Sequence, residues 1–358
     1  MDAMTAVLFV LGLGLLIGGA EALVRGASGL AARFGIPPLV IGLTVVAYGT
    51  SAPEMAIGAA SALRGQSDLA FGNVVGSNLF NLLFILGLAA ALTPLAVSRQ
   101  LLRLDVPVMI GVTGLGFLLA LDGTVGRFDG ALLLLGAAGY TVLLLRLARR
   151  EPAPTPADAQ RAPLPVPLQL LLIAAGLAAL VLGSRWLVAG AVAVARWLGL
   201  SELVIGLTIV AAGTSLPEVA SSVVASLRGE RDIAVGNVVG SSTFNVLAVL
   251  GLSGLLAPDG IAAAPAVLRF DMPVLLAASL ACLPVFFTDC RISRWEGLLF
   301  LGTYLAYVAY LVLDAQGHDA LPAYSAVLTY FAAPLVAATL GVLTFRALRR
   351  GNDRPCGR

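Results

Sequence analysis

Two glutamates lie deep within apolar segments of the chain. Glu54 ends the block GTSAPE (49–54), and Glu218 ends the closely similar block GTSLPE (213–218). A carboxylate near the middle of a bilayer is costly, and such residues usually mark an ion or substrate pathway. Because the two acids occupy matching positions in similar blocks, we interpret them as one shared binding site rather than as two structural, hydrogen-bonded side chains.

Polar side chains also interrupt the apolar segment that follows each glutamate. They are Asn73, Ser77, Asn78 and Asn81 after the first, and Asn237, Ser241, Ser242 and Asn245 after the second. Three members of each set recur at intervals of four residues, so they share one face of a helix. Serine and asparagine often serve as hydrogen-bonding links between membrane helices. A whole stripe that accompanies a buried glutamate favours a role in binding.

Each block also predicts a break in its helix. Pro53 and Pro217 remove a backbone donor and obstruct the preceding turn, and the nearby glycines weaken the helix further. Such a break leaves main-chain carbonyls free as ligands, and lipid tolerates it only where it lines a cavity or packs against protein.

The ligand inventory is therefore one of hard oxygens: carboxylates, hydroxyls, amides and carbonyls. Calcium takes six to eight such oxygens, and sodium also accepts them. Copper and zinc are disfavoured because the three cysteines lack metal-type spacing and the chain has a single histidine, His318. We expect transported ions rather than a cofactor.

The elements that position these residues are membrane spans. Of the 358 residues, 59% are hydrophobic and 12% charged, too apolar for a soluble domain. The net charge of +2 gives no reason to expect nucleic-acid binding. Eleven apolar windows can be distinguished. They fall at about 4–24, 38–63, 69–93, 104–121, 128–147, 167–189, 203–226, 233–257, 268–288, 296–314 and 321–345.

The arginines indicate an orientation. If the amino terminus is outside, 17 arginines fall in inside segments and 5 in outside segments. Because cytoplasmic loops carry the excess of basic residues, this predicts a carboxyl terminus in the cytoplasm of a cell (inner) membrane.

The most informative feature is an internal repeat. Residues 39–88 align with residues 203–252 at a constant offset of 164, and 31 of the 50 positions are identical. Weaker similarity extends the repeat to about five spans per half. Because five is odd, equivalent helices cross the membrane in opposite directions, and inverted repeats place their site near the midplane.

The predicted fold is an all-α membrane protein with two inverted five-helix repeats, forming a ten-span core, plus one extra C-terminal transmembrane helix. The predicted units are a first repeat at 1–148, a cytoplasmic proline-rich linker at 149–166, a second repeat at 167–314, and an extra span with a basic cytoplasmic tail at 315–358.

The paired GTSAPE and GTSLPE blocks, with the paired GNVVGSNLFN and GNVVGSSTFN blocks, resemble the two alpha repeats of the sodium/calcium exchanger family, in the cation/calcium exchanger superfamily. The resemblance covers the first ten spans, so the window at 321–345 departs from the family pattern. It implies that Glu54 and Glu218 bind calcium.

The resemblance also implies roles for other residues. Main-chain carbonyls at Thr50 and Thr214 would assist calcium binding. Asn81 and Asn245 match the polar pair at the edge of the family site. The implied sodium sites comprise the side chains of Ser51, Ser77, Ser215 and Ser241 and the carbonyls of Ala47 and Ala211.

The function expected from these residues is exchange of calcium for sodium by alternating access, without ATP. Calcium/proton exchange would use the same glutamates and stays open, although the serines and the asparagine pair favour sodium. A passive cation channel is a further alternative, in which flux would ignore counter-ion gradients. An enzyme is disfavoured, since nothing resembles a nucleophile with a base. The sequence does not indicate an oligomeric state.

Overall fold

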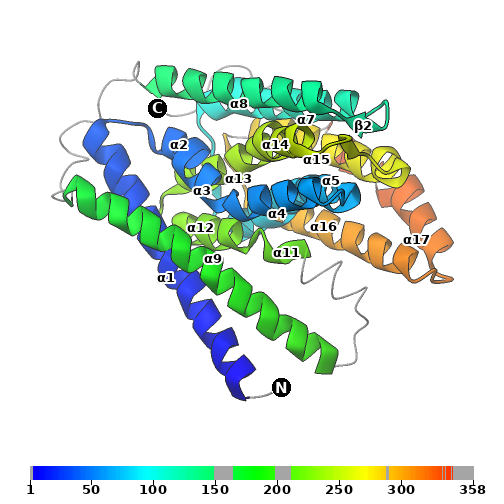
Figure 1. Ribbon diagram of the computed structural model, residues 1–358, viewed down its shortest axis with the longest axis horizontal. Coiled ribbons are helices and arrows are strands. Elements are labelled where there is room, and N and C mark those ends of the chain that lie inside the picture. Colours follow the sequence, from blue (N-terminus) through cyan, green and yellow to red (C-terminus); the bar gives the residue numbers. More distant parts are fainter. Residues whose placement is uncertain are drawn as a thin grey trace.

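The structure, a computed structural model, describes residues 3–148, 164–197, 211–287, 290–332, 334, 336–339 and 341. These residues are almost entirely helical, with two short antiparallel strand pairs (Figure 1). Among them, eight helices are long and apolar enough to cross a membrane, and one bent helix pair is a ninth candidate. The protein is therefore a helical, multi-pass membrane protein.

The first half contains, in chain order, α1 (Ala3–Phe34), α2 (Pro38–Ile41), the π-helical segment η1 (Gly42–Val46), α3 (Ala47–Thr50), α4 (Ala52–Leu63), α5 (Ser67–Leu79), η2 (Phe80–Ile85), α6 (Leu86–Leu92), β1 (Leu95–Ala96), η3 (Leu101–Asp105), α7 (Val106–Leu119), β2 (Thr124–Val125) and α8 (Arg127–Ala148). In this half α5, η2 and α6 form one continuous span, as do η3 and α7.

The second half contains α9 (Val166–Trp197), α11 (Ala211–Gly213), α12 (Leu216–Leu227), α13 (Arg231–Phe244), η5 (Asn245–Leu250), α14 (Gly251–Leu256), β3 (Ile261–Ala262), η6 (Val267–Asp271), α15 (Met272–Phe287), β4 (Arg291–Ile292), α16 (Arg294–Ala315), α17 (Leu321–Val327) and η7 (Leu328–Ala332). Here α13, η5 and α14 form one continuous span, as do η6 and α15.

Nine of the eleven predicted windows coincide with these candidate spans. The predicted window at 203–226 is described only from Ala211 onward, and the one at 321–345 only in part. Most of the predicted linker, residues 149–163, also lies outside the described residues. The number of spans therefore stays a prediction.

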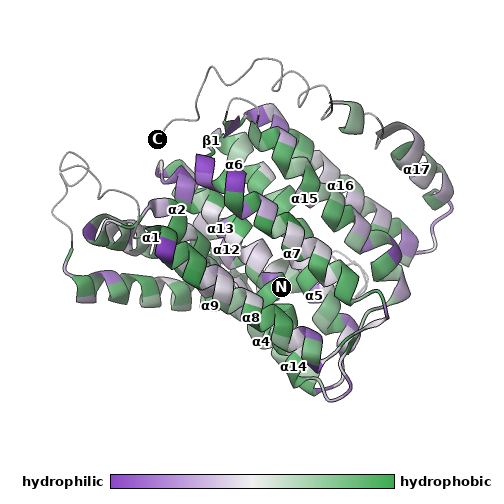
Figure 2. Ribbon diagram, turned by 90° about the horizontal axis from the view of Figure 1, so that it is seen from above, coloured by the Kyte–Doolittle hydropathy of each residue, from purple (hydrophilic) through white to green (hydrophobic). Residues whose placement is uncertain are grey.

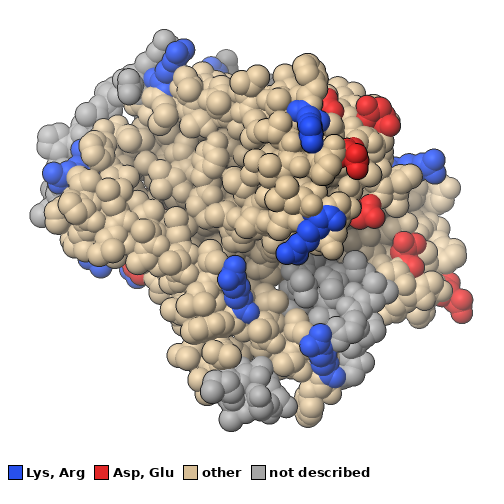
Figure 3. All heavy atoms as spheres, viewed as in Figure 1, with Lys and Arg blue, Asp and Glu red and all other residues tan. Residues whose placement is uncertain are grey.

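Helices α1 and α9 are longer than their predicted windows because they continue beyond the uniformly apolar stretch. Helix α1 includes Arg25 and Arg33, and α9 includes Arg196. Long basic side chains allow this, since their stems lie along apolar surface while their charged groups reach the polar boundary. The outer helices are mostly hydrophobic in Figure 2, and charged side chains are sparse on the face shown in Figure 3.

The two spans that carry the polar stripes lie at the centre of the bundle. In Arg231–Leu256 the whole apolar stretch is buried, and in Ser67–Leu92 78% of it is buried. In Arg294–Ala315 only 6% is buried, as expected of a helix that faces lipid. The stripes are therefore shielded by the surrounding helices.

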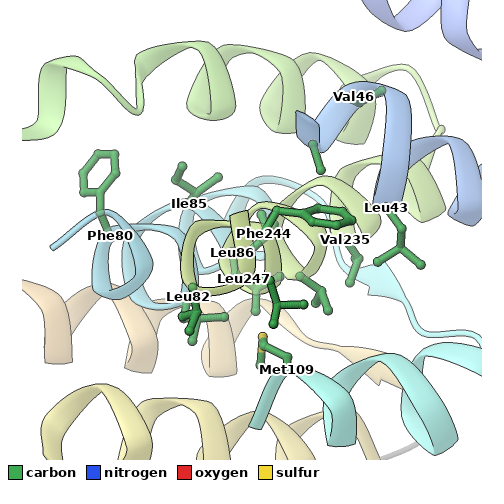
Figure 4. Close-up of a cluster of buried hydrophobic side chains, with 14 of the residues drawn as sticks. Leu43, Val46, Phe80, Leu82, Ile85, Leu86, Met109, Val235, Phe244 and Leu247 are labelled. Carbon is green, nitrogen blue, oxygen red and sulfur yellow. The ribbon is translucent and has the colours of Figure 1, made fainter. Parts of the chain in front are cut away.

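Apolar packing holds these two spans together. Figure 4 shows side chains of η2 and α6 packed against side chains of α13 and η5, with η1 and α7 closing the cluster. The labelled members, all buried, are Leu43, Val46, Phe80, Leu82, Ile85, Leu86, Met109, Val235, Phe244 and Leu247. Close packing of this kind leaves little freedom for the polar residues on the other faces of the same helices.

Helices α1 and α9 form a separate pair that projects from the rest of the bundle (Figure 1). Glycines allow their backbones to approach closely. A Cβ atom on Gly176 would lie 2.7 Å from the carbonyl oxygen of Gly19, and one on Gly183 would lie 2.8 Å from that of Gly12. Small residues at such positions are typical of tightly packed membrane helices.

Contacts recur in matching pairs, both between the two halves and within each half. Strand β1 pairs with β4, and β2 pairs with β3. A tyrosine–aspartate hydrogen bond also recurs, from Tyr140 to Asp105 at 2.9 Å in the first half and from Tyr307 to Asp271 at 2.7 Å in the second. The sequence repeat is thus accompanied by repeated contacts.

Candidate functional site

The first predicted helix break lies at Ser51. Helix α3 ends at Thr50 and α4 begins at Ala52, and the two segments of this span meet at an angle of 45°. Ser51 has φ −78° and ψ 5°, outside the helical range, and Pro53 occupies the first turn of α4. Because proline has no N–H, the preceding turn loses a helical hydrogen bond here, and the predicted break is confirmed.

The second break has the same form where the structure describes it. Helix α11 ends at Gly213, a turn at Thr214 and Ser215 follows, and α12 begins at Leu216. Ser215 has φ −91° and ψ 9°, and Pro217 lies in the first turn of α12. Both breaks therefore place a glutamate in the first turn of the helix that follows.

The two glutamates are held by serines from the opposite block. Ser215 donates a hydrogen bond to Oε1 of Glu54 at 2.9 Å, and Ser51 donates one to Oε1 of Glu218 at 3.2 Å. Each glutamate is only 1% exposed. Within the described residues, Oε2 of each carboxylate has no hydrogen-bond partner. The site thus contains two buried carboxylate oxygens that no described protein group satisfies.

A polar network connects this pair to α13. The hydroxyl of Thr50 lies 3.1 Å from Oδ1 of Asn237, and the amide nitrogen of Asn237 donates to Ser221 at 3.0 Å and Ser222 at 2.9 Å. Ser221 donates in turn to the carbonyl oxygen of Glu218 at 3.2 Å. The block of the first repeat is thereby tied to the second glutamate.

The first repeat has a smaller counterpart of this network. Asn73 donates to the carbonyl oxygen of Glu54 at 3.3 Å. Positions equivalent to Ser221 and Ser222 are occupied by Ile57 and Gly58, which carry no hydroxyl. Because the two serines have no counterpart in the first repeat, the repeat does not indicate them. Their helical spacing from Glu218, which places them on its face of α12, is the signal in the sequence.

The structure also describes the remaining predicted residues, in differing detail. Ser241 donates to the carbonyl oxygen of Ala47 at 3.5 Å, a long hydrogen bond. Ser77 is 3% exposed and lies on the buried face of α5. The hydroxyl of Thr214 has no partner in the described part of the chain. Ala211 is the first residue of helix α11, and its side chain lies outside what the structure describes.

The asparagine pair lies where both central spans change to π-helical geometry. Asn81 lies in η2 and Asn245 begins η5. Each is 1% exposed. Local π-helical turns occur frequently at functional sites. This irregularity was not predicted, because the residues around both asparagines have an ordinary helical pattern.

The site resembles no transition-metal centre in the residues that the structure describes. They contain no group of three or more histidine, cysteine, aspartate or glutamate side chains that could hold a metal ion. Two carboxylates surrounded by neutral hydroxyl, amide and carbonyl oxygens suit a hard cation.

Comparison with known proteins is consistent with this geometry. The family model described as sodium/calcium exchanger protein matches residues 4–146 and 168–313. The chain is 42% identical over 313 residues to the putative antiporter CaxA of Alkalimonas amylolytica, covering 85% of this chain and 98% of the relative. It is 34% identical over 351 residues to the sodium/calcium exchanger MaX1 of Methanosarcina acetivorans, covering 87% and 99%.

The fold is also that of a solved exchanger. A structure of the sodium-calcium exchanger NCX_Mj, soaked with Na⁺ and Ca²⁺, superposes with a TM-score of 0.74 at 30% sequence identity, covering 86% of this chain and 99% of the other. The family match extends over most of both halves and includes the buried glutamates, the helix breaks and the polar stripes. The chain therefore belongs to the sodium/calcium exchanger family.

Proposed function

We propose that this protein is a secondary-active antiporter that exchanges calcium for sodium across the membrane by alternating access. The observation that carries the proposal is the pair Glu54 and Glu218. Both are buried, both are held by a serine of the opposite repeat, and both keep one carboxylate oxygen without a described partner. Such oxygens are suited to a dehydrated cation.

Charge explains why the two ions would be coupled. With both glutamates ionised the empty site carries a charge of about −2, and exposing that charge to the bilayer interior is costly. One calcium ion neutralises it, and so do two sodium ions. Only a loaded site would then pass between the two sides, which produces exchange without ATP.

The proposed ligands follow the repeat. Glu54 and Glu218 bind calcium, with the carbonyls of Thr50 and Thr214. Asn81 and Asn245 border the site. Sodium is bound by the side chains of Ser51, Ser77, Ser215 and Ser241 and the carbonyls of Ala47 and Ala211. The relatives support this choice of ions, since MaX1 and NCX_Mj are both named as sodium and calcium exchangers.

The proposed topology is a pair of inverted five-helix repeats with the site near the midplane. The recurring breaks at Ser51 and Ser215 and the repeated contacts between the halves support this arrangement. The amino terminus lies outside and the carboxyl terminus in the cytoplasm. The segment at 321–345 is an eleventh span beyond the ten-span core.

The test is transport by the full-length protein in liposomes. Vesicles loaded with sodium are diluted into sodium-free buffer, and uptake of radiolabelled calcium is followed. Potassium-loaded and acid-loaded vesicles are measured in parallel. Glu54→Gln and Glu218→Gln test the site, because each removes a charge with little change in shape.

We expect uptake that requires internal sodium and is lost in both glutamine variants. Uptake driven by internal acid alone would replace sodium with protons as the counter-ion, because two protons also neutralise the pair. Uptake that ignores every gradient would indicate a channel. Full activity in both variants would refute the assignment of the site.

A further inference from the structure

Position 78 is one of the buried positions at which the two repeats differ. Position 78 is asparagine, and the equivalent position 242 is serine. Asn78 is fully buried on α5 and contacts the second repeat at two points. Its amide nitrogen donates to the main-chain carbonyl of Ser242 at 3.0 Å, and its Oδ1 accepts from the amide nitrogen of Asn245 at 3.0 Å. Asn78 thus links the two central spans.

This network determines which way the amide of Asn245 faces. A main-chain carbonyl can only accept a hydrogen bond, so the nitrogen of Asn78 must face Ser242 and its oxygen must face Asn245. Asn245 can satisfy that oxygen only with its own nitrogen. The amide oxygen of Asn245 is therefore left over, and it has no partner in the described residues.

The free oxygen belongs to the functional face of α13 and η5. Asn245 follows Asn237 and Ser241 at intervals of four, and these two contact Thr50 and the carbonyl of Ala47. A cation on this face would meet an acceptor oxygen from Asn245 rather than an N–H group.

We propose that Asn78 is a positioning residue that holds Asn245 with its amide oxygen available to the transported cation. The proposal rests on the exchange function proposed above and deepens it. We call the two hydrogen bonds of Asn78, to Ser242 and Asn245, the clamp. It acts on Asn245 and has no counterpart at Asn81. Ser242, the counterpart of Asn78, carries a side chain too short to act in the same way, and both amide atoms of Asn81 lack partners in the described structure. Of the pair Asn81 and Asn245, therefore, it is Asn245 whose side-chain amide has a defined orientation.

The experiment measures calcium binding to the purified full-length protein. Titration with radiolabelled calcium compares the wild type, Asn78→Ser, Asn245→Ala and the double variant. Asn78→Ser installs the residue that the second repeat already has at this position. The control is Thr243→Val, which removes a buried hydroxyl that donates to the carbonyl of Val239 in its own helix. Thermal unfolding with and without calcium reports folding separately, because calcium stabilises only protein that binds it.

We expect Asn78→Ser to weaken calcium binding roughly tenfold, the size of an interaction with a charged group. In the Asn245→Ala background the same change should have no further effect, because the residue through which it acts is gone. Thr243→Val should bind calcium as the wild type does.

Two results would overturn the clamp while leaving exchange intact: an unchanged affinity in Asn78→Ser, or an equal loss in the wild-type and Asn245→Ala backgrounds. A purely structural role would lower the unfolding temperature but leave the calcium-induced shift of the folded protein unchanged. A wild-type protein that binds no calcium would refute the proposed function, and this inference with it.

Discussion

Removing the hydroxyl of Ser215 tests how the glutamates are held. In Ser215→Ala, Oε1 of Glu54 would lose the hydroxyl that donates to it, and Oε2 already has no hydrogen-bond partner in the described residues. The carboxylate would then be free to rotate away from the ion position, and calcium would have to reverse that change on binding.

The size of the effect follows from the geometry. Hydrogen bonds to charged groups contribute about 1.5–3 kcal/mol, and the strongest hydroxyl–carboxylate bonds are shorter than about 2.7 Å. At 2.9 Å the Ser215 bond belongs at the lower end of this range, which corresponds to about a tenfold loss of calcium affinity. The Ser51 bond to Glu218 is longer, at 3.2 Å, so Ser51→Ala should lose less, about threefold.

The assay is titration of the purified protein with radiolabelled calcium in sodium-free buffer, because both serines are also proposed sodium ligands, with Ser279→Ala as the matched control. Ser279 is buried too, but its hydroxyl bonds to the carbonyl of Leu275 in its own helix. The control should keep the wild-type calcium affinity. The reasoning fails if Ser215→Ala behaves like the control, or if Ser51→Ala loses more affinity than Ser215→Ala.

Three further predictions concern stability and packing. Phe244→Ala should lower the free energy of unfolding by about 3–5 kcal/mol, measured in detergent, because it empties the centre of the buried cluster. Arg228→Ala should change it by less than about 1 kcal/mol, because the ion pair with Glu21 lies on the outside of the bundle, and a loss well above about 1 kcal/mol would contradict this. Gly176→Val should separate α1 from α9 and lower both thermal stability and transport, whereas Gly139→Ala, where an added Cβ meets no atom within 4 Å, should not.

Much of the candidate site could be predicted from the sequence, because its signals are local. A carboxylate in an apolar segment, a proline after glycine, and side chains at intervals of four are set by neighbouring residues. The break at Ser51 and the burial of Glu54 and Glu218 confirm those predictions. The repeat strengthened each signal by showing it twice.

Other features required the folded chain. The change to π-helical geometry at η2 and η5 has no periodic signal in the sequence, and the lengths of α1 and α9 exceed their apolar windows. Ser221 and Ser222 do not stand out in the sequence, because the internal repeat draws attention to identical positions. These two positions differ between the halves.

The sequence by itself determined the class of protein, nine of the candidate spans and the acids that lie within apolar segments, because lipid imposes a strict relation between composition and position in the chain. Only the tertiary structure decided how the residues pair. Ser51 reaches Glu218, Ser215 reaches Glu54, and Asn78 orients Asn245, each across more than 150 residues of chain. The physical reason is that these hydrogen bonds depend on how the central helices pack against each other, and no spacing along the chain encodes that distance.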